Sequence, residues 1–187
     1  MLHPARSYSL SPRQPRVARP NLNQKKLPAL ISEVRKSAAD VLNRPVSELS
    51  GRQVKSDHRI LALWAADCAE HVLPYFEESH PDDDRPRRAI EACREWVTAG
   101  ASKTADVRRA SFEAHAAARS AKEKGAIAAA RAAGHAAATA HVPTHALGSA
   151  AYALKAAASR DGKDYSLMRE RDWQLRRLRE YAKRDTQ

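Results

Sequence analysis

Alanine dominates the stretch from Ala101 to Arg160, where it occupies 25 of 60 positions. It is the strongest intrinsic helix former, and its short side chain lets two helix axes approach closely. Bulky apolar residues are scarce, since Leu, Ile, Val and Phe together make up only 30 of 187 residues. Such a composition, with a formal charge of +11, would by itself lean towards disorder. The alanine stretch reverses that expectation for the middle of the chain and predicts closely packed helices.

Apolar residues recur at helical spacing through much of the chain, and no segment shows the alternation of a β-strand. The sequence therefore predicts an all-α protein, a compact bundle of about six helices with alanine-rich close packing. A short first helix is expected at 28–42, and the helices of the bundle at 57–78, 85–97, 103–123, 126–142, 144–160 and 167–184.

Proline and glycine predict two details of the packing. Pro74 lacks a backbone donor and clashes with the carbonyl four residues back, so we expect a kink near Glu70 and a free carbonyl there. Gly134 and Gly148 suggest close backbone contact between the two helices that contain them.

The first fifty residues differ in composition from the rest. Residues 1–27 contain four prolines and no acidic residue, which predicts a disordered basic arm rather than a targeting segment. We therefore divide the chain into a basic, Pro-rich arm at 1–50, with a possible short helix, and an all-helical domain at 51–187. The sequence has no run of 18 strongly apolar residues, and we expect a cytoplasmic protein without a membrane partner. Cys68 and Cys93 lie in apolar helical patterns and are expected to be reduced and buried.

Three ionisable residues interrupt the apolar segment "WAADCAEH", at 64–71. They lie within one helical turn and could form a metal or acid–base cluster with later histidines, or a hydrogen-bonded polar network. Helical bundles often bind metals through a Glu-x-x-His pair on each of two helices, and the sequence lacks this repeated motif. We therefore favour the network and predict no catalytic residue, no metal and no cofactor. The predicted network consists of Asp67, Glu70, His71, His115, His135, His141 and His145.

The segment "EESHPDDD", at 77–84, is the only strongly acidic cluster of the chain. Part of it should cap the next helix, since Asp83 or Asp84 can accept from free N–H groups at its start and Pro86 fits its first turn. Loops often carry recognition, so the cluster also predicts a contact for a basic partner. The predicted contact residues are Glu77, Glu78, Asp82, Asp83 and Asp84.

Three segments together resemble one family of small bacterial helical proteins. They are "DHRILALWAADCAEHVLPYFEESHPDDDRPRRAIEACREW", "AAGHAAATAHVPTHALGSAAYALKAA" and "ERDWQL", and the resemblance covers the chain from about Asp57 to Leu178. In order and content they are similar to the immunity proteins of bacterial polymorphic toxin systems. The resemblance implies a non-enzymatic protein that binds and blocks a cognate toxin made by its own cell or its kin, and it supplies no catalytic residues.

Two other functions remain as alternatives. The basic arm and the Arg-rich tail could bind nucleic acid weakly and nonspecifically through counterion release, although the sequence lacks the motifs of a specific reader. A metal-dependent hydrolase would use Asp67, Glu70, His71 and the later histidines. The sequence leaves the oligomeric state open.

Overall fold

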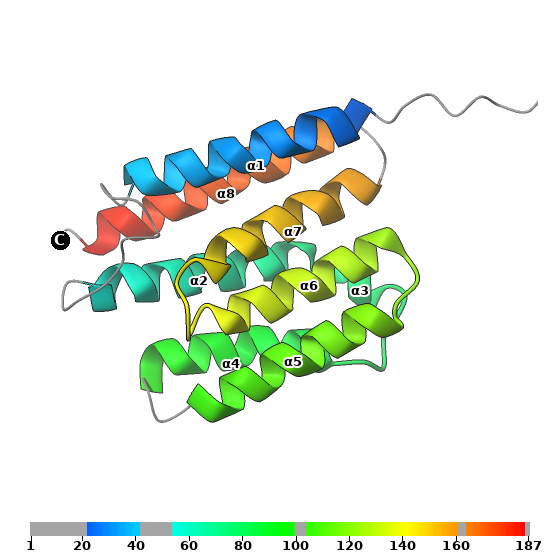
Figure 1. The fold of residues 1–187 in the computed structure, drawn as a ribbon, viewed down its shortest axis with the longest axis horizontal. Coiled ribbons are helices and arrows are strands. Elements are labelled where there is room, and N and C mark those ends of the chain that lie inside the picture. Colours follow the sequence, from blue (N-terminus) through cyan, green and yellow to red (C-terminus); the bar gives the residue numbers. More distant parts are fainter. Residues whose placement is uncertain (1–21, 42–53, 100–103, 161–163, 186–187) are drawn as a thin grey trace, which may run out of the picture.

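The computed structural model describes residues 22–41, 54–99, 104–160 and 164–185, and these segments form a helical bundle (Figure 1). The described residues contain helices and turns but no strand, so the predicted all-α class is confirmed. Residues 1–21 and 42–50 of the predicted basic arm lie outside them, while residues 22–41 of the arm are described and helical. The helices are α1 (Leu22–Val41), α2 (Val54–Val72), α3 (Pro74–Glu77), α4 (Arg85–Ala99), α5 (Thr104–Ser120), α6 (Lys124–Ala138), α7 (His145–Arg160) and α8 (Asp164–Asp185).

The helices are arranged in successive layers across the bundle. Helices α1 and α8 lie side by side at one edge, α4 and α5 lie at the opposite edge, and α2, α6 and α7 lie between them (Figure 1). Helix α6 packs against α2, α3, α4, α5 and α7, so it has neighbours on most of its sides. Such a central helix has little room for large side chains.

Small residues fill that central position. Nine residues of α6 are buried, and they are eight alanines and Gly134. The helices come so close that short side chains reach the backbone of a neighbour. Ser111 Oγ donates to the carbonyl of Gly134 at 2.9 Å, and Ser149 Oγ donates to the carbonyl of Ala65 at 2.8 Å. The predicted alanine-rich close packing is therefore present in the structure.

The few bulky side chains gather where α2 meets α3 and α8. Trp64 and Phe76 are fully buried, and Trp64 Nε1 donates to the carbonyl of Gln174 at 2.9 Å. Cys68 and Cys93 are free and buried, as expected. Burial raises the pKa of both thiols, to about 12 for Cys93, so both stay protonated at neutral pH.

The structure differs from the sequence prediction around two prolines. A kinked helix was expected at Pro74, but the helix is interrupted there: α2 ends at Val72, and Pro74 starts α3 in the first-turn position that suits proline. The carbonyl of Glu70 is not free, since it accepts from the N–H of Leu73 at 3.1 Å. Helix α1 begins six residues before the predicted start and includes Pro28, and it packs against α7 and α8.

The two glycines make room for histidine rings. A Cβ atom on Gly134 would lie 2.6 Å from Cε1 of His115, and one on Gly148 would lie 2.7 Å from Nδ1 of His135. The backbone of each glycine therefore faces an imidazole, and α6 and α7, which contain these glycines, pack closely against each other as the sequence suggested.

We predict that Ala129→Leu lowers the free energy of unfolding by about 1–3 kcal/mol, because a fully buried position in α6 has no space for the added carbons. Chemical denaturation monitored by circular dichroism measures the change. Ala105→Leu on the exposed side of α5 is the matched control and should change stability by less than about 0.5 kcal/mol. Equal stability of the two variants would contradict the close packing of α6.

Candidate functional site

One carboxylate connects three helices of the bundle. Asp67 lies on α2 among the buried residues of that helix and is only 7% exposed. One of its oxygens accepts from Nη2 of Arg94 on α4 at 2.9 Å. The other accepts from Nε of Arg177 at 2.5 Å and from the hydroxyl of Tyr181 at 2.7 Å, both on α8. Buried charge is stable only when it is paired in this way.

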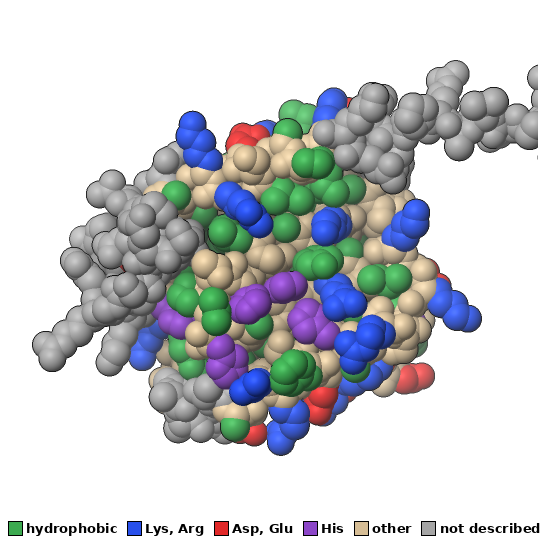
Figure 2. Space-filling model, viewed as in Figure 1, with side chains coloured by type: hydrophobic (Ala, Val, Ile, Leu, Met, Phe, Trp, Pro, Cys, Tyr) green, Lys and Arg blue, Asp and Glu red, His purple; other side chains and the backbone are tan. Residues whose placement is uncertain are grey.

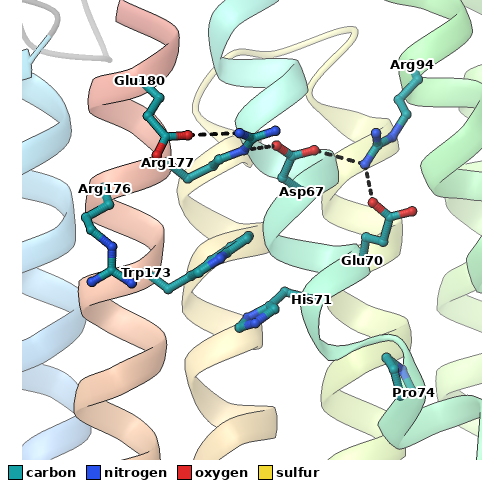
Figure 3. Close-up of a pocket in the computed structure, with 9 residues that line it drawn as sticks. All are labelled: Asp67, Glu70, His71, Pro74, Arg94, Trp173, Arg176, Arg177 and Glu180. Carbon is teal, nitrogen blue, oxygen red and sulfur yellow. Dashed lines mark hydrogen bonds and ion pairs between the residues drawn. The ribbon is translucent and has the colours of Figure 1, made fainter.

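The pairing continues outward to the surface as an ion-pair network. Arg94 Nη2 also donates to Glu70 at 2.5 Å, and Arg177 Nη1 donates to Glu180 at 2.9 Å (Figure 3). Hydrogen bonds to Asp67 and Glu180 raise the pKa of Arg177 above its ordinary value. Burial and then the hydrogen bond to Asp67 raise the pKa of Tyr181 to about 12. Arg177 and Tyr181 therefore both remain protonated donors at neutral pH.

His71 belongs to a separate pair with α8. Its Nδ1 lies 2.6 Å from Oε2 of Glu170, which is 4% exposed, and Gln174 Nε2 donates to the other oxygen of Glu170 at 2.9 Å. The hydrogen bond with Glu170 raises the pKa of His71 above its ordinary value of 6.5. The imidazole also stacks on Trp173, with ring centroids 4.0 Å apart and an interplanar angle of 10°.

These groups line a cleft with a volume of about 680 Å³ between the end of α2 and helices α3, α4 and α8. Figure 3 shows Trp173 and His71 side by side in this cleft. Arg176 also lines it and, within the described residues, has no hydrogen bond or ion pair. The cleft therefore offers an aromatic ring and one unpaired guanidinium beside groups that neutralise one another. Its residues are Asp67, Glu70, His71, Pro74, Arg94, Trp173, Arg176, Arg177 and Glu180.

The four other histidines of the predicted network lie elsewhere. His115 is on α5, His135 on α6 and His145 at the start of α7, while His141 is exposed in the turn between α6 and α7. The first three contact one another, and in the described part of the chain none of the four bonds to Asp67. The structure therefore divides the predicted network into two clusters on different helices.

Arginines of the same region pair with three of the five acidic residues predicted as a partner contact. Asp83 accepts from Nε and Nη2 of Arg85 and from its backbone N–H, so it caps α4 as the sequence predicts. These hydrogen bonds lower the pKa of Asp83. The other pairs are Glu77 with Arg87 and Asp84 with Arg88, while Glu78 and Asp82 are exposed.

The partners of Asp67 and His71 are the functional residues that sequence reasoning missed. Four of these residues lie along α8 at intervals of four, three and four positions: Glu170, Gln174, Arg177 and Tyr181. This spacing puts them on one face of the helix, so a polar stripe beside the apolar one was the available signal. Within the described residues, no group of three or more His, Cys, Asp or Glu side chains could hold a metal ion.

The fold and the site define a compact, alanine-rich helical bundle with a charged cleft between its helices. Residues 52–181 match the family described as Imm-5 like putative immunity protein, and the chain belongs to that family. The resemblance noted in the sequence is thus confirmed. Comparison with curated proteins and with solved structures gave no match. No helix in the described ranges is long and apolar enough to cross a membrane.

We predict that Asp67→Asn lowers the free energy of unfolding by about 2–3 kcal/mol, because it removes a charged acceptor from the partly buried guanidinium groups of Arg94 and Arg177. Urea denaturation measures the loss. Glu180→Gln, at the exposed end of the same network, is the matched control, and it should cost less than about 1 kcal/mol. An equal effect of the two substitutions would show that Asp67 does not hold the helices together.

We predict that His71 titrates above pH 6.5 and that Glu170→Gln returns its pKa towards that value. Because the folded pKa is raised, the pair contributes its full stability below pH 6.5 and loses it as the pH rises through the folded pKa of His71. Imidazole NMR titration measures both values, with His71→Asn identifying the signal. An unchanged titration in the Glu170→Gln variant would contradict the pair.

Proposed function

We propose that this protein is an immunity protein that binds a toxin made by its own bacterial cell or its kin, and that it neutralises the toxin without catalysing a reaction. Membership of the family over residues 52–181 is the observation that carries the proposal. A rigid bundle with an open charged cleft is consistent with a protein that acts by occupying a surface of its target.

The cleft between α2, α4 and α8 is the proposed centre of the toxin contact. Trp and Arg are the residue types that most often dominate binding energy at protein interfaces. Trp173 is half-buried and already held against His71, so it loses little freedom when a partner covers it. The unpaired guanidinium of Arg176 can bind a carboxylate or a carbonyl group of the toxin.

The acidic loop at 77–84 extends this proposed contact. Pro74 lines the cleft and starts α3, which leads directly into the loop. Because Glu77, Asp83 and Asp84 are paired with arginines, the exposed Glu78 and Asp82 are the loop residues proposed to meet basic groups of the toxin. The loop then contributes specificity and association rate more than affinity.

Co-expression with a candidate toxin domain, sought among the neighbouring genes, tests the function. We expect rescue of growth and a complex that survives purification. Trp173→Ala should weaken the complex about thirtyfold, which corresponds to an interface hot spot of about 2 kcal/mol. Arg176→Glu should also weaken it, whereas Arg179→Glu, an equal change of charge at an exposed position of α8, should not.

Absence of both rescue and complex would overturn the proposed function. A complex whose affinity is unchanged by Trp173→Ala and Arg176→Glu would keep the immunity function but exclude the cleft as its contact. Circular dichroism of both variants checks that the bundle remains folded.

A further inference from the structure

Histidine and basic residues form three parallel stripes on α5, α6 and α7. In Figure 2 histidines gather over these helices, with Lys and Arg around them. The intervals are three or four residues on α5 and α6 and seven and three residues on α7, which places each set on one face of its helix. We call this surface the histidine face. It consists of Arg108, Phe112, His115 and Arg119 on α5, Arg131 and His135 on α6, His141 and Val142 in the turn, and His145, Tyr152 and Lys155 on α7.

The rings at the centre of the histidine face contact one another. His115 and His135 meet edge to face with centroids 5.2 Å apart, and Nδ1 of His135 lies 3.3 Å from Nδ1 of His145. Tyr152 stacks on His135 with centroids 5.2 Å apart. Gly148 gives His135 the space to lie against the backbone of α7, so the rings have fixed positions. The backbone of α6 and α7 thus leaves space for these side chains, so the rings are packed into the surface.

The cations of the histidine face have no acidic partner among the described residues, whereas many arginines elsewhere in the bundle do. Arg108 lies over Phe112, Lys155 lies 4.2 Å from the ring centroid of Tyr152, and no acidic side chain pairs with Arg119 or Arg131 within the described residues. This difference leaves an uncompensated positive charge on one side of the bundle. Arginines paired with acids elsewhere include Arg85, Arg87, Arg88, Arg94, Arg171 and Arg177.

Two of the imidazoles at the centre of this charge, His115 and His135, are neutral at pH 7. The pKa of His135 is lowered to about 4, mainly by burial and further by the nearby charges of His115, His145, Arg131 and Lys155. Burial and neighbouring cations also lower the pKa of His115. The charged groups that act on His135 come from α5, α6 and α7, and in the described chain none comes from α2, α3 or α4. The Nδ1 atom of His115 is also buried without a hydrogen-bond partner among those residues.

We propose that the histidine face is a docking surface for an acidic segment of a partner polypeptide. Carboxylates would supply the counter-charge that Arg119, Arg131 and Lys155 lack, and charge complementarity of this kind steers association. The face also carries Phe112, which is 61% exposed, and Val142, which is 44% exposed. Arginine with aromatic and apolar side chains is the composition of protein interfaces, so it favours a polypeptide over nucleic acid.

This surface goes beyond the proposed toxin contact because it uses different helices. The cleft is lined by residues of α2, α3, α4 and α8, whereas the histidine face is formed by α5, α6, α7 and the α6–α7 turn. A bound carboxylate stabilises imidazolium, so docking is accompanied by proton uptake at His115 or His135. For each proton taken up, the affinity rises by up to about tenfold when the pH is lowered by one unit.

A short poly-L-glutamate peptide, added to the isotope-labelled full chain, tests this surface. We expect NMR shifts at His115, His135 and His145, and calorimetry in buffers of different ionisation enthalpy should show proton uptake. Arg131→Glu combined with Lys155→Glu should weaken binding at least tenfold. Lys36→Glu combined with Arg179→Glu is the matched control on α1 and α8, and it should have a much smaller effect.

Three outcomes would overturn the docking surface. They are the absence of binding, binding whose shifts are confined to residues 1–27, and equal loss of binding in the two double variants. If a DNA duplex shifts the signals of the same histidines and binds more tightly than the peptide, the ligand of the histidine face is nucleic acid and not a polypeptide. Failure of this test leaves the toxin experiment unaffected, because that experiment uses different variants and a different readout.

Discussion

The structure depends on the close approach of helix α6 to the helices around it. This helix packs against five others, and its buried residues are alanines and one glycine. A large side chain at any of these positions would push a neighbour outward, because protein interiors are close-packed and have few voids. The same closeness lets Ser111 and Ser149 bond to the backbone of adjacent helices. A chain with few bulky apolar residues therefore still forms a dense core.

Helix α8 reaches this core through polar contacts as well as leucines. Asp67 on α2 binds arginines of α4 and α8. In a second contact between α2 and α8, the carboxylate is on α8, where Glu170 binds His71 of α2. Because the partners of these carboxylates extend to the surface, the interhelical network also forms the wall of the cleft. Stability and the shape of the cleft are therefore connected, and a substitution that changes one is expected to change the other.

The distribution of charge distinguishes two surfaces of the bundle. Around the cleft and the acidic loop, arginines and carboxylates are paired, so Trp173 and Arg176 stand out as available groups. On the histidine face, Arg119, Arg131 and Lys155 lie around His115 and His135, whose lowered pKa keeps them neutral at pH 7, and these cations have no acidic partner among the described residues. An overall charge of +11 could not reveal this difference, because it depends on which helix faces meet.

The sequence by itself determined the helical class, most helix positions, a helix cap at Asp83 or Asp84 and the family, because these follow from local propensity, spacing and motif order. It also placed Asp67 and the later histidines among the notable polar groups. Only the tertiary structure decided their partners: Asp67 contacts Arg94 and Arg177, whereas His135 contacts His115 and His145. Helical spacing gives the face on which a side chain lies, but the rotation and order of packing of the helices determine which faces meet.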